Sequence, residues 1–274
     1  MLPKMQAKDN TTDESLPVFE NTIIDRIEAI PAEEVQFSSF WNLDTVIIKV
    51  ESTLFNVPRQ VLDVPGTTFA DMFSIPLAGD KTLEGQSKTN PIILDSSFSA
   101  HDFDAFLRML LSPIKNPVSG YDEFLGVLRL AHKWNYDEIR EKAIQALTPL
   151  IKGSEHAATK VHLGKQFLVQ EWLRQGLIDI SVDLDLGLED LANAPFRFDT
   201  DYISRIFFIQ KEDLRESDYR EKRICRFCHL RTVNNSGKCA RTGCARLQPS
   251  MSTAERVEKV FGDELAAYAF HPSC

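Results

Sequence analysis

Residues 45–73 limit the possible folds of this chain more than any other stretch. They read TVIIKVESTLFNVPRQVLDVPGTTFADMF, with two apolar, β-branched runs on either side of a polar turn at 51–53. Two such runs separated by a few polar residues are typical of a β-hairpin. Pro58 suits the first turn of a helix, and the Pro65-Gly66 pair separates two short helical patterns. The stretch therefore predicts a scaffold of two strands and two helices, without a nucleophile, base or phosphate-binding loop.

Residues 91–147 add a strand and three helices to this scaffold. The run PIIL at 91–94 predicts a short strand, because proline is tolerated at the first position of a strand. Ser99, with an acid three residues later, is an N-cap arrangement, and apolar residues recur at helical spacing after it. The same spacing predicts helices over 121–134 and 137–147. Apolar stripes of this width are typical of helix faces buried in a core.

Residues 44–150 resemble a BTB/POZ domain of the divergent kind that is abundant in fungi. The resemblance is carried by VIIKVESTLFNVPRQVL, TTFADMFSIP, NPIILD, FDAFLRMLL and FLGVLRLAHKWNYDEIREKAIQAL, in the order and at the spacings of that family. It implies an α+β fold in which a small mixed β-sheet is capped by a helical cluster over residues 37–151. The family's His-Arg-x-x-Leu pattern is matched at Arg59 and Leu62, with Pro58 in place of the histidine. The family often has an aspartate at the position of Thr45, and here Asp44 is displaced from it by one residue. Since that aspartate and the arginine line the co-repressor pocket of some members, the resemblance does not imply such a pocket here.

The resemblance also implies what such a chain does. Members of the family bind other proteins, commonly as homodimers, and some recruit a cullin ubiquitin ligase. The helical pattern of residues 152–219 resembles the α-helical extension that often follows these domains. The expected function is therefore a non-enzymatic protein–protein interaction module.

The remaining segments have simpler signatures. Residues 1–36 are acidic and polar, which predicts a flexible segment. The helical pattern continues over residues 157–180, and the charge-dense stretch 211–223 predicts a linker or an exposed helix. In the last segment, 251–274, a capping box that begins at Ser252 predicts a helix that packs back on the body.

Four closely spaced cysteines form the one constellation with predicted chemistry. Cys225-x2-Cys228 and Cys239-x4-Cys244 are two local pairs, and His229 is an alternative ligand. Four soft ligands on tight turns suit a structural, tetrahedral Zn²⁺, and a closed set of four leaves no open position for a catalytic water. Unligated thiols in a surface loop are an equal alternative, whereas disulfides or a redox pair fit the context less well. No other cofactor is expected.

The cysteine-rich segment, residues 220–250, is also basic. Within it, residues 220–246 hold eight lysines and arginines and one acid, a local charge of +7. A basic module can bind phosphate backbones, dock on acidic parts of its own chain, or remain a solvated loop. Phe227 is its only aromatic residue, which disfavours base stacking, so nucleic acid is not the favoured partner.

Composition narrows the remaining classes of function. The net charge of −9 argues against a general nucleic-acid coat, and no run approaches the ~18 apolar residues of a membrane span. Without an export signal, we expect an intracellular location, in the cytoplasm or nucleus. No G-x-S-x-G, Walker, dinucleotide-glycine or H-E-x-x-H motif is present, so no enzyme is expected. A nucleic-acid-associated regulator and a cullin-type substrate adaptor are the alternatives to the interaction module.

Overall fold

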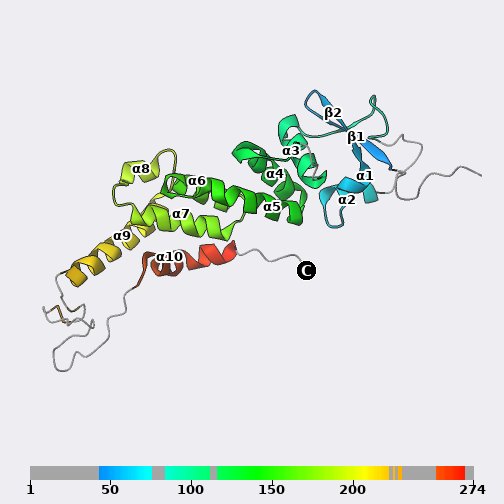
Figure 1. Cartoon of the computed structure of the whole chain (residues 1–274). Helices are drawn as coiled ribbons and strands as arrows, with labels where there is room; N and C mark the ends of the chain where they lie inside the picture. The colour runs from blue at the N-terminus through cyan, green and yellow to red at the C-terminus, as the bar shows by residue number, and fades with distance from the viewer. Residues whose placement is uncertain are drawn as a thin grey trace, which may run out of the picture. The chain divides into compact units, whose positions relative to one another are not determined.

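A computed structural model describes residues 43–75, 84–111, 116–221, 225, 228, 229 and 251–268 of the 274. The predicted flexible segment 1–36 and two of the predicted zinc ligands, Cys239 and Cys244, lie outside the described residues. The described part is mixed α and β, with a three-stranded sheet followed by helices (Figure 1).

The predicted hairpin is confirmed. Strand β1 (Thr45–Val50) pairs antiparallel with β2 (Thr53–Pro58), in a register that places Ile48 opposite Phe55. The predicted strand at 91–94 is also present, as β3 (Ile92–Ile93), which runs parallel to β1 on its other side. The sheet order is β2-β1-β3, and alternate residues of β1 are buried beneath the helices.

Five α-helices complete the first half of the described chain. They are α1 (Arg59–Leu62), α2 (Thr68–Ser74), α3 (Ala100–Leu111), α4 (Gly120–Trp134) and α5 (Asp137–Leu147). These bounds confirm the predicted helices, and the backbone N–H of Asp102 donates to Ser99 Oγ (3.0 Å), as an N-cap arrangement requires. The chain then continues into a 3₁₀ helix, η1 (Thr148–Ile151).

An aromatic cluster forms the centre of the first core. The Trp134 ring lies 5.1 Å from Phe69, 5.9 Å from Phe103 and 5.3 Å from Phe106, each in an edge-to-face arrangement. Since these side chains come from α2, α3 and α4, the cluster joins the hairpin unit to the helices.

The second half of the described chain is helical. It consists of η2 (Ser154–His156), α6 (Ala157–Gln166), α7 (Gln170–Val182), α8 (Leu188–Ala192), α9 (Thr200–Glu221) and α10 (Thr253–Ala267). The predicted helical stretch 157–180 is confirmed, and it is divided into α6 and α7 because Leu168 takes a left-handed φ of 55°. The stretch 211–223 is helical as far as Glu221, and it is not exposed throughout, since Glu216 is buried.

Helix α10 packs back on the body, as predicted. Ser252 Oγ accepts a hydrogen bond from the Glu255 N–H (3.2 Å), and the Glu255 carboxylate accepts one from the Ser252 N–H (2.7 Å). One face of α10, with Val257, Phe261 and Leu265, is fully buried in a second core against α7 and α9 (Figure 1). In the described part of the chain, no helix has the length and apolarity to span a membrane.

Helices α6 and α7 approach each other very closely. A Cβ placed on Gly164 of α6 would lie 2.6 Å from the backbone nitrogen of Leu173 in α7. A Cβ on Gly176 of α7 would lie 2.9 Å from the carbonyl oxygen of Ala157 in α6. Only residues without a side chain fit at these two positions, because backbone atoms cannot rotate away.

Candidate functional site

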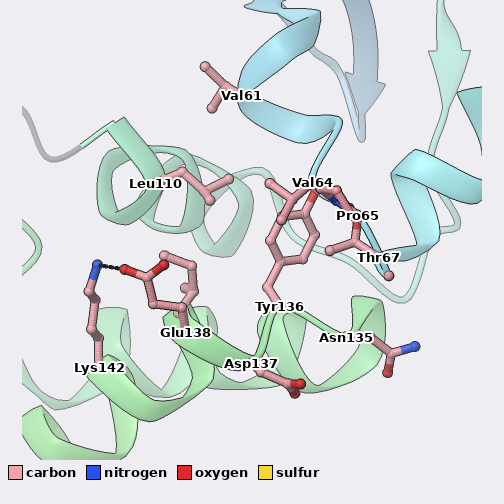
Figure 2. Close-up of a pocket in the computed structure, with 12 residues that line it drawn as sticks. Val61, Val64, Pro65, Thr67, Leu110, Asn135, Tyr136, Asp137, Glu138 and Lys142 are labelled. Atoms are coloured by element: carbon pink, nitrogen blue, oxygen red, sulfur yellow. Dashed lines mark hydrogen bonds and ion pairs between the residues drawn. The ribbon is translucent and has the colours of Figure 1, made fainter. Parts of the chain in front are cut away.

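An open cleft of about 900 Å³ lies between the loop that joins α1 to α2, the end of α3 and the start of α5 (Figure 2). Its volume is in the range of ligand and peptide pockets. The lining is about equally apolar and polar, and its apolar part consists of the side chains of Val61, Val64, Pro65, Leu110 and Ile139.

The upper rim of the cleft is a rigid turn. The Thr67 N–H donates to Val64 O (3.2 Å), with Pro65 and Gly66 in the two central positions. Gly66 has a φ of +83°, which a type II turn requires at its third residue and which glycine adopts without strain. The Thr67 hydroxyl donates to Val64 O (2.7 Å) and accepts from Ala70 N (3.3 Å), so the turn also caps α2.

The lower rim is the junction of α4 and α5. Asn135 takes a left-handed conformation (φ 60°) that ends α4 and reverses the chain. The hydroxyl of Tyr136 then donates to Leu62 O (2.6 Å), and Figure 2 shows its ring reaching from α5 to the upper rim. Burial raises the pKa of Tyr136 to about 12, so this hydroxyl stays a donor at neutral pH.

Charges gather on the α5 side of the cleft. Asp137 and Glu138 occupy the first turn of α5, and Lys142 Nζ donates to Glu138 Oε1 (2.6 Å) (Figure 2). Among the residues that the structure describes, no lysine, arginine or histidine lies within 4.0 Å of the Asp137 carboxylate. The rim therefore offers two exposed carboxylates, of which Glu138 is paired with Lys142 and Asp137 has no described cation within 4.0 Å, an arrangement that suits a basic group attached to an apolar one.

The hydroxyl groups of the cleft form structural hydrogen bonds. No cysteine, serine or histidine is among the described residues that line it. Its Thr67 hydroxyl and Tyr136 phenol are both engaged with backbone carbonyls. Neither group is placed as an activated nucleophile, because no base accepts a proton from it.

Arg59, which the resemblance places at the family's partner pocket, has contacts within its own lobe. Its guanidinium donates to Phe73 O (3.2 Å), lies 4.6 Å from the centre of the Phe73 ring, and pairs with Asp63 (3.7 Å). These contacts join α1 to α2 and so support the loop that forms the upper rim.

Two of the four predicted zinc ligands can be placed. Cys225 is fully buried, Cys228 is half-buried, and the His229 N–H donates to Cys225 O (2.8 Å). This bond closes a tight turn over the first cysteine pair, as local ligand pairs require. Within the described residues, no group of three or more histidine, cysteine or acidic side chains could hold a metal ion. Since Cys239 and Cys244 are outside those residues, the zinc site stays a prediction.

Other buried ionisable groups have structural roles. Burial lowers the pKa of His132, whose ring lies edge-on 5.7 Å from that of Phe167. Burial also lowers the pKa of Arg140, which donates to Phe167 O (2.6 Å) at the α6–α7 break. Lys160 pairs with Asp179 (2.5 Å) between α6 and α7. His132 is thus a partly buried helix residue, and none of these groups is among the described residues that line the cleft.

Comparisons with protein-family models, with curated proteins and with solved structures gave no match for this chain. Function must therefore be argued from the cleft and the surface.

The cleft was not predicted from the sequence. Its walls come from residues 61–67, Leu110 and residues 135–142, which are distant in the chain and individually look like core or turn positions. The Pro65-Gly66 pair and Asn135 were the available signals, because each predicts a chain reversal at a surface.

Proposed function

We propose that this chain is a non-enzymatic protein–protein interaction module, in which a BTB/POZ-like lobe, residues 37–151, binds partner proteins or a second copy. The order of its described elements supports this proposal: an antiparallel hairpin, two short helices, a parallel third strand and three helices. This is the order that the sequence resemblance implies. The helical part after this lobe then acts as its extension.

The cleft is the observation on which the proposal depends. It combines an apolar wall with an exposed acid, Asp137, and it is held open by the turn at Val64 and the hydrogen bond of Tyr136. A partner that buries one leucine-sized side chain there gains roughly 1.5–3 kcal/mol, and a rigid cleft loses little entropy on binding. A polypeptide with an apolar side chain next to a lysine or arginine fits both features.

Substitution of Val64 tests the proposal. Val64 is 39% exposed, so Val64→Lys leaves the core intact while it places a charge at the apolar wall. Leu54→Lys is the matched control, because Leu54 is 44% exposed on β2, away from the residues that line the cleft. The measurement is quantitative affinity capture from cells with each variant, together with the solution mass of the purified chain.

We expect the wild type and Leu54→Lys to capture the same partner proteins in equal amounts. Val64→Lys should capture at least about fivefold less of them, which corresponds to a loss of ~1 kcal/mol in binding free energy. A cullin among them would identify the adaptor alternative, and a second copy would double the solution mass. Equal retention by all three chains, with a monomeric mass, would refute the proposal. Turnover of a small compound by the purified chain would refute it as well.

The local charge of +7 over residues 220–246 supports one second candidate, a nucleic-acid-associated regulator. Its test is the binding of labelled DNA and RNA as a function of salt. If phosphate contacts hold the probe, binding weakens steeply with salt and is lost when residues 220–250 are deleted. Salt-independent binding, or binding that survives the deletion, would rule this candidate out.

A further inference from the structure

The link between α7 and α8 exposes aliphatic side chains among acids. Val182 is 60% exposed, Leu184 55% and Leu188 58%, which is unusual for three large apolar residues within one short link. The same stretch, residues 182–190, contains four acids and no basic residue, a local charge of −4. All four acids, Asp183, Asp185, Glu189 and Asp190, are exposed.

This link is fixed against α9. Gln210 Nε2 donates to Asp183 O (2.8 Å) and to Ile180 O (3.4 Å), and Leu191 of α8 is fully buried in the second core. Leu214 comes one helical turn after Gln210, on the same side of α9, and is 52% exposed. Residues 182–190 and Leu214 together form a surface that we term the acidic-aliphatic surface.

The negative charge of this surface is not neutralised by its neighbours. In the described part of the chain, none of its four acids forms an ion pair within 4.0 Å. Two of their carboxylates accept neutral backbone N–H groups instead: Asp183 from Asp185 (3.1 Å) and Asp190 from Gly187 (2.8 Å). These bonds shape the link and leave its full charge in place.

We propose that the basic cysteine-rich segment of the same chain, residues 222–250, docks on the acidic-aliphatic surface. The segment contains seven lysines and arginines and no acid, so its charge of +7 complements the charge of −4. Its first part also has apolar residues at every third position, Ile224, Phe227 and Leu230, to match the exposed leucines. Docking would thereby neutralise the acids of the surface and cover its exposed aliphatic side chains.

The place where the segment leaves the described helix favours this occupant over a separate basic protein. Helix α9 ends at Glu221, only ~10 Å along its axis from Leu214. The nine residues from 230 to 238, which follow the turn at Cys225–His229, span up to ~30 Å when extended, which is enough to return to the surface. A tether of this length gives an effective concentration in the millimolar range, so even weak contacts keep the segment docked.

Carbodiimide crosslinking tests the contact directly, because it joins a lysine amine to a carboxylate that it touches. The segment has two lysines, Lys222 and Lys238. In an equimolar mixture of ¹⁴N- and ¹⁵N-labelled full-length chains, we expect crosslinks from Lys238 to Asp185 or Glu189 within single chains. Crosslinks between differently labelled chains would identify a second copy as the occupant and overturn the proposal. Crosslinks from Lys238 only to acids outside residues 182–190 would overturn it as well.

Proteolysis gives an independent measurement. The surface variant carries Asp183→Asn, Asp185→Asn and Glu189→Gln, which introduce no new trypsin site. The control variant carries the same change of charge at other exposed acids of the first lobe, as Asp71→Asn, Asp122→Asn and Glu141→Gln. Circular dichroism verifies that all three chains are folded before trypsin is added.

We expect trypsin to cut residues 222–246 about tenfold faster in the surface variant than in the wild type or control, if docking protects about nine molecules in ten. Salt should accelerate cleavage of the wild type and leave the surface variant unchanged, because it screens the same charges. Equal cleavage rates in all three chains, or faster cleavage in the control, would overturn the proposal. The proposal would also be overturned if a basic protein that copurifies with the chain protected residues 222–246 from trypsin equally well in the surface variant and in the wild type.

Discussion

Gly164→Ala is expected to destabilise the fold, although the same change usually stabilises a helix. In a helix interior, alanine is better than glycine by about 1 kcal/mol. At Gly164, however, the new methyl group would lie 2.6 Å from the Leu173 nitrogen and 2.9 Å from its Cα. Both are backbone atoms of α7, so relief requires the two helices to separate.

The size of the effect is set by these two contributions. Overpacking a close contact costs about 1–3 kcal/mol, and a contact with backbone belongs at the upper end of that range. After the gain in helix propensity is subtracted, we expect Gly164→Ala to lower the free energy of unfolding by about 1–2 kcal/mol. Separation of α6 from α7 would also loosen both cores, since these two helices contribute to each.

Gly262→Ala is the matched control. Gly262 lies inside α10 and a Cβ there would meet no atom within 4 Å, so this variant should gain about 0.5–1 kcal/mol. The measurement is urea unfolding of both variants, followed by far-UV circular dichroism. If Gly164→Ala stabilises the chain as much as Gly262→Ala does, the close approach of α6 and α7 is refuted.

Three further predictions concern other parts of the chain. Arg256→Met removes the buried cation that pairs with Asp213 and Glu216 of α9 and should lower the free energy of unfolding by about 2–4 kcal/mol in urea. Arg174→Met, at an exposed pair, should lower it by less than about 1 kcal/mol, and equal effects of the two changes would contradict this. Tyr136→Phe should cost about 1–2 kcal/mol at pH 7. The pKa of Tyr136 is about 12 in the folded chain and 10.0 in an exposed tyrosine, so the stability that the neutral phenol contributes is complete below pH 10 and is lost as the pH rises toward 12. The Tyr136→Phe variant should therefore lose less stability than the wild type between pH 10 and 12. Purified protein should contain about one equivalent of zinc that Cys225→Ser releases, and metal analysis that finds less than about half an equivalent would exclude the site.

Local signals in the sequence were sufficient for the sheet and most helix bounds. The polar turn at 51–53 and Pro58 delimit the hairpin, and the helix predicted over 137–147 has those same bounds in the structure. In each case, the residues that start or end the element lie within a few positions of it, so no distant contact was needed to predict them.

Distant contacts decided what the sequence did not reveal. The break between α6 and α7 occurs at Leu168, whose carbonyl and that of Phe167 accept hydrogen bonds from Arg140, far earlier in the chain. The charged end of α9 is helical and partly buried because Arg256 of α10 pairs with its acids. The cleft likewise combines three separate segments. Hydrophobic periodicity and turn residues are local signals, so they do not predict contacts between distant segments.

Completion of the second core by α10 has a consequence during synthesis. Helix α7 ends at Val182, but the strip of Val257, Phe261 and Leu265 that covers it is translated only after the cysteine-rich segment. At ~5–20 residues per second, that delay is on the order of 4–17 s. During this time the first lobe has all of its own strands and helices, whereas the apolar faces of α7 and α9 that α10 later covers are still exposed to solvent. We therefore expect ribosome-associated chaperones to bind this chain chiefly in that interval.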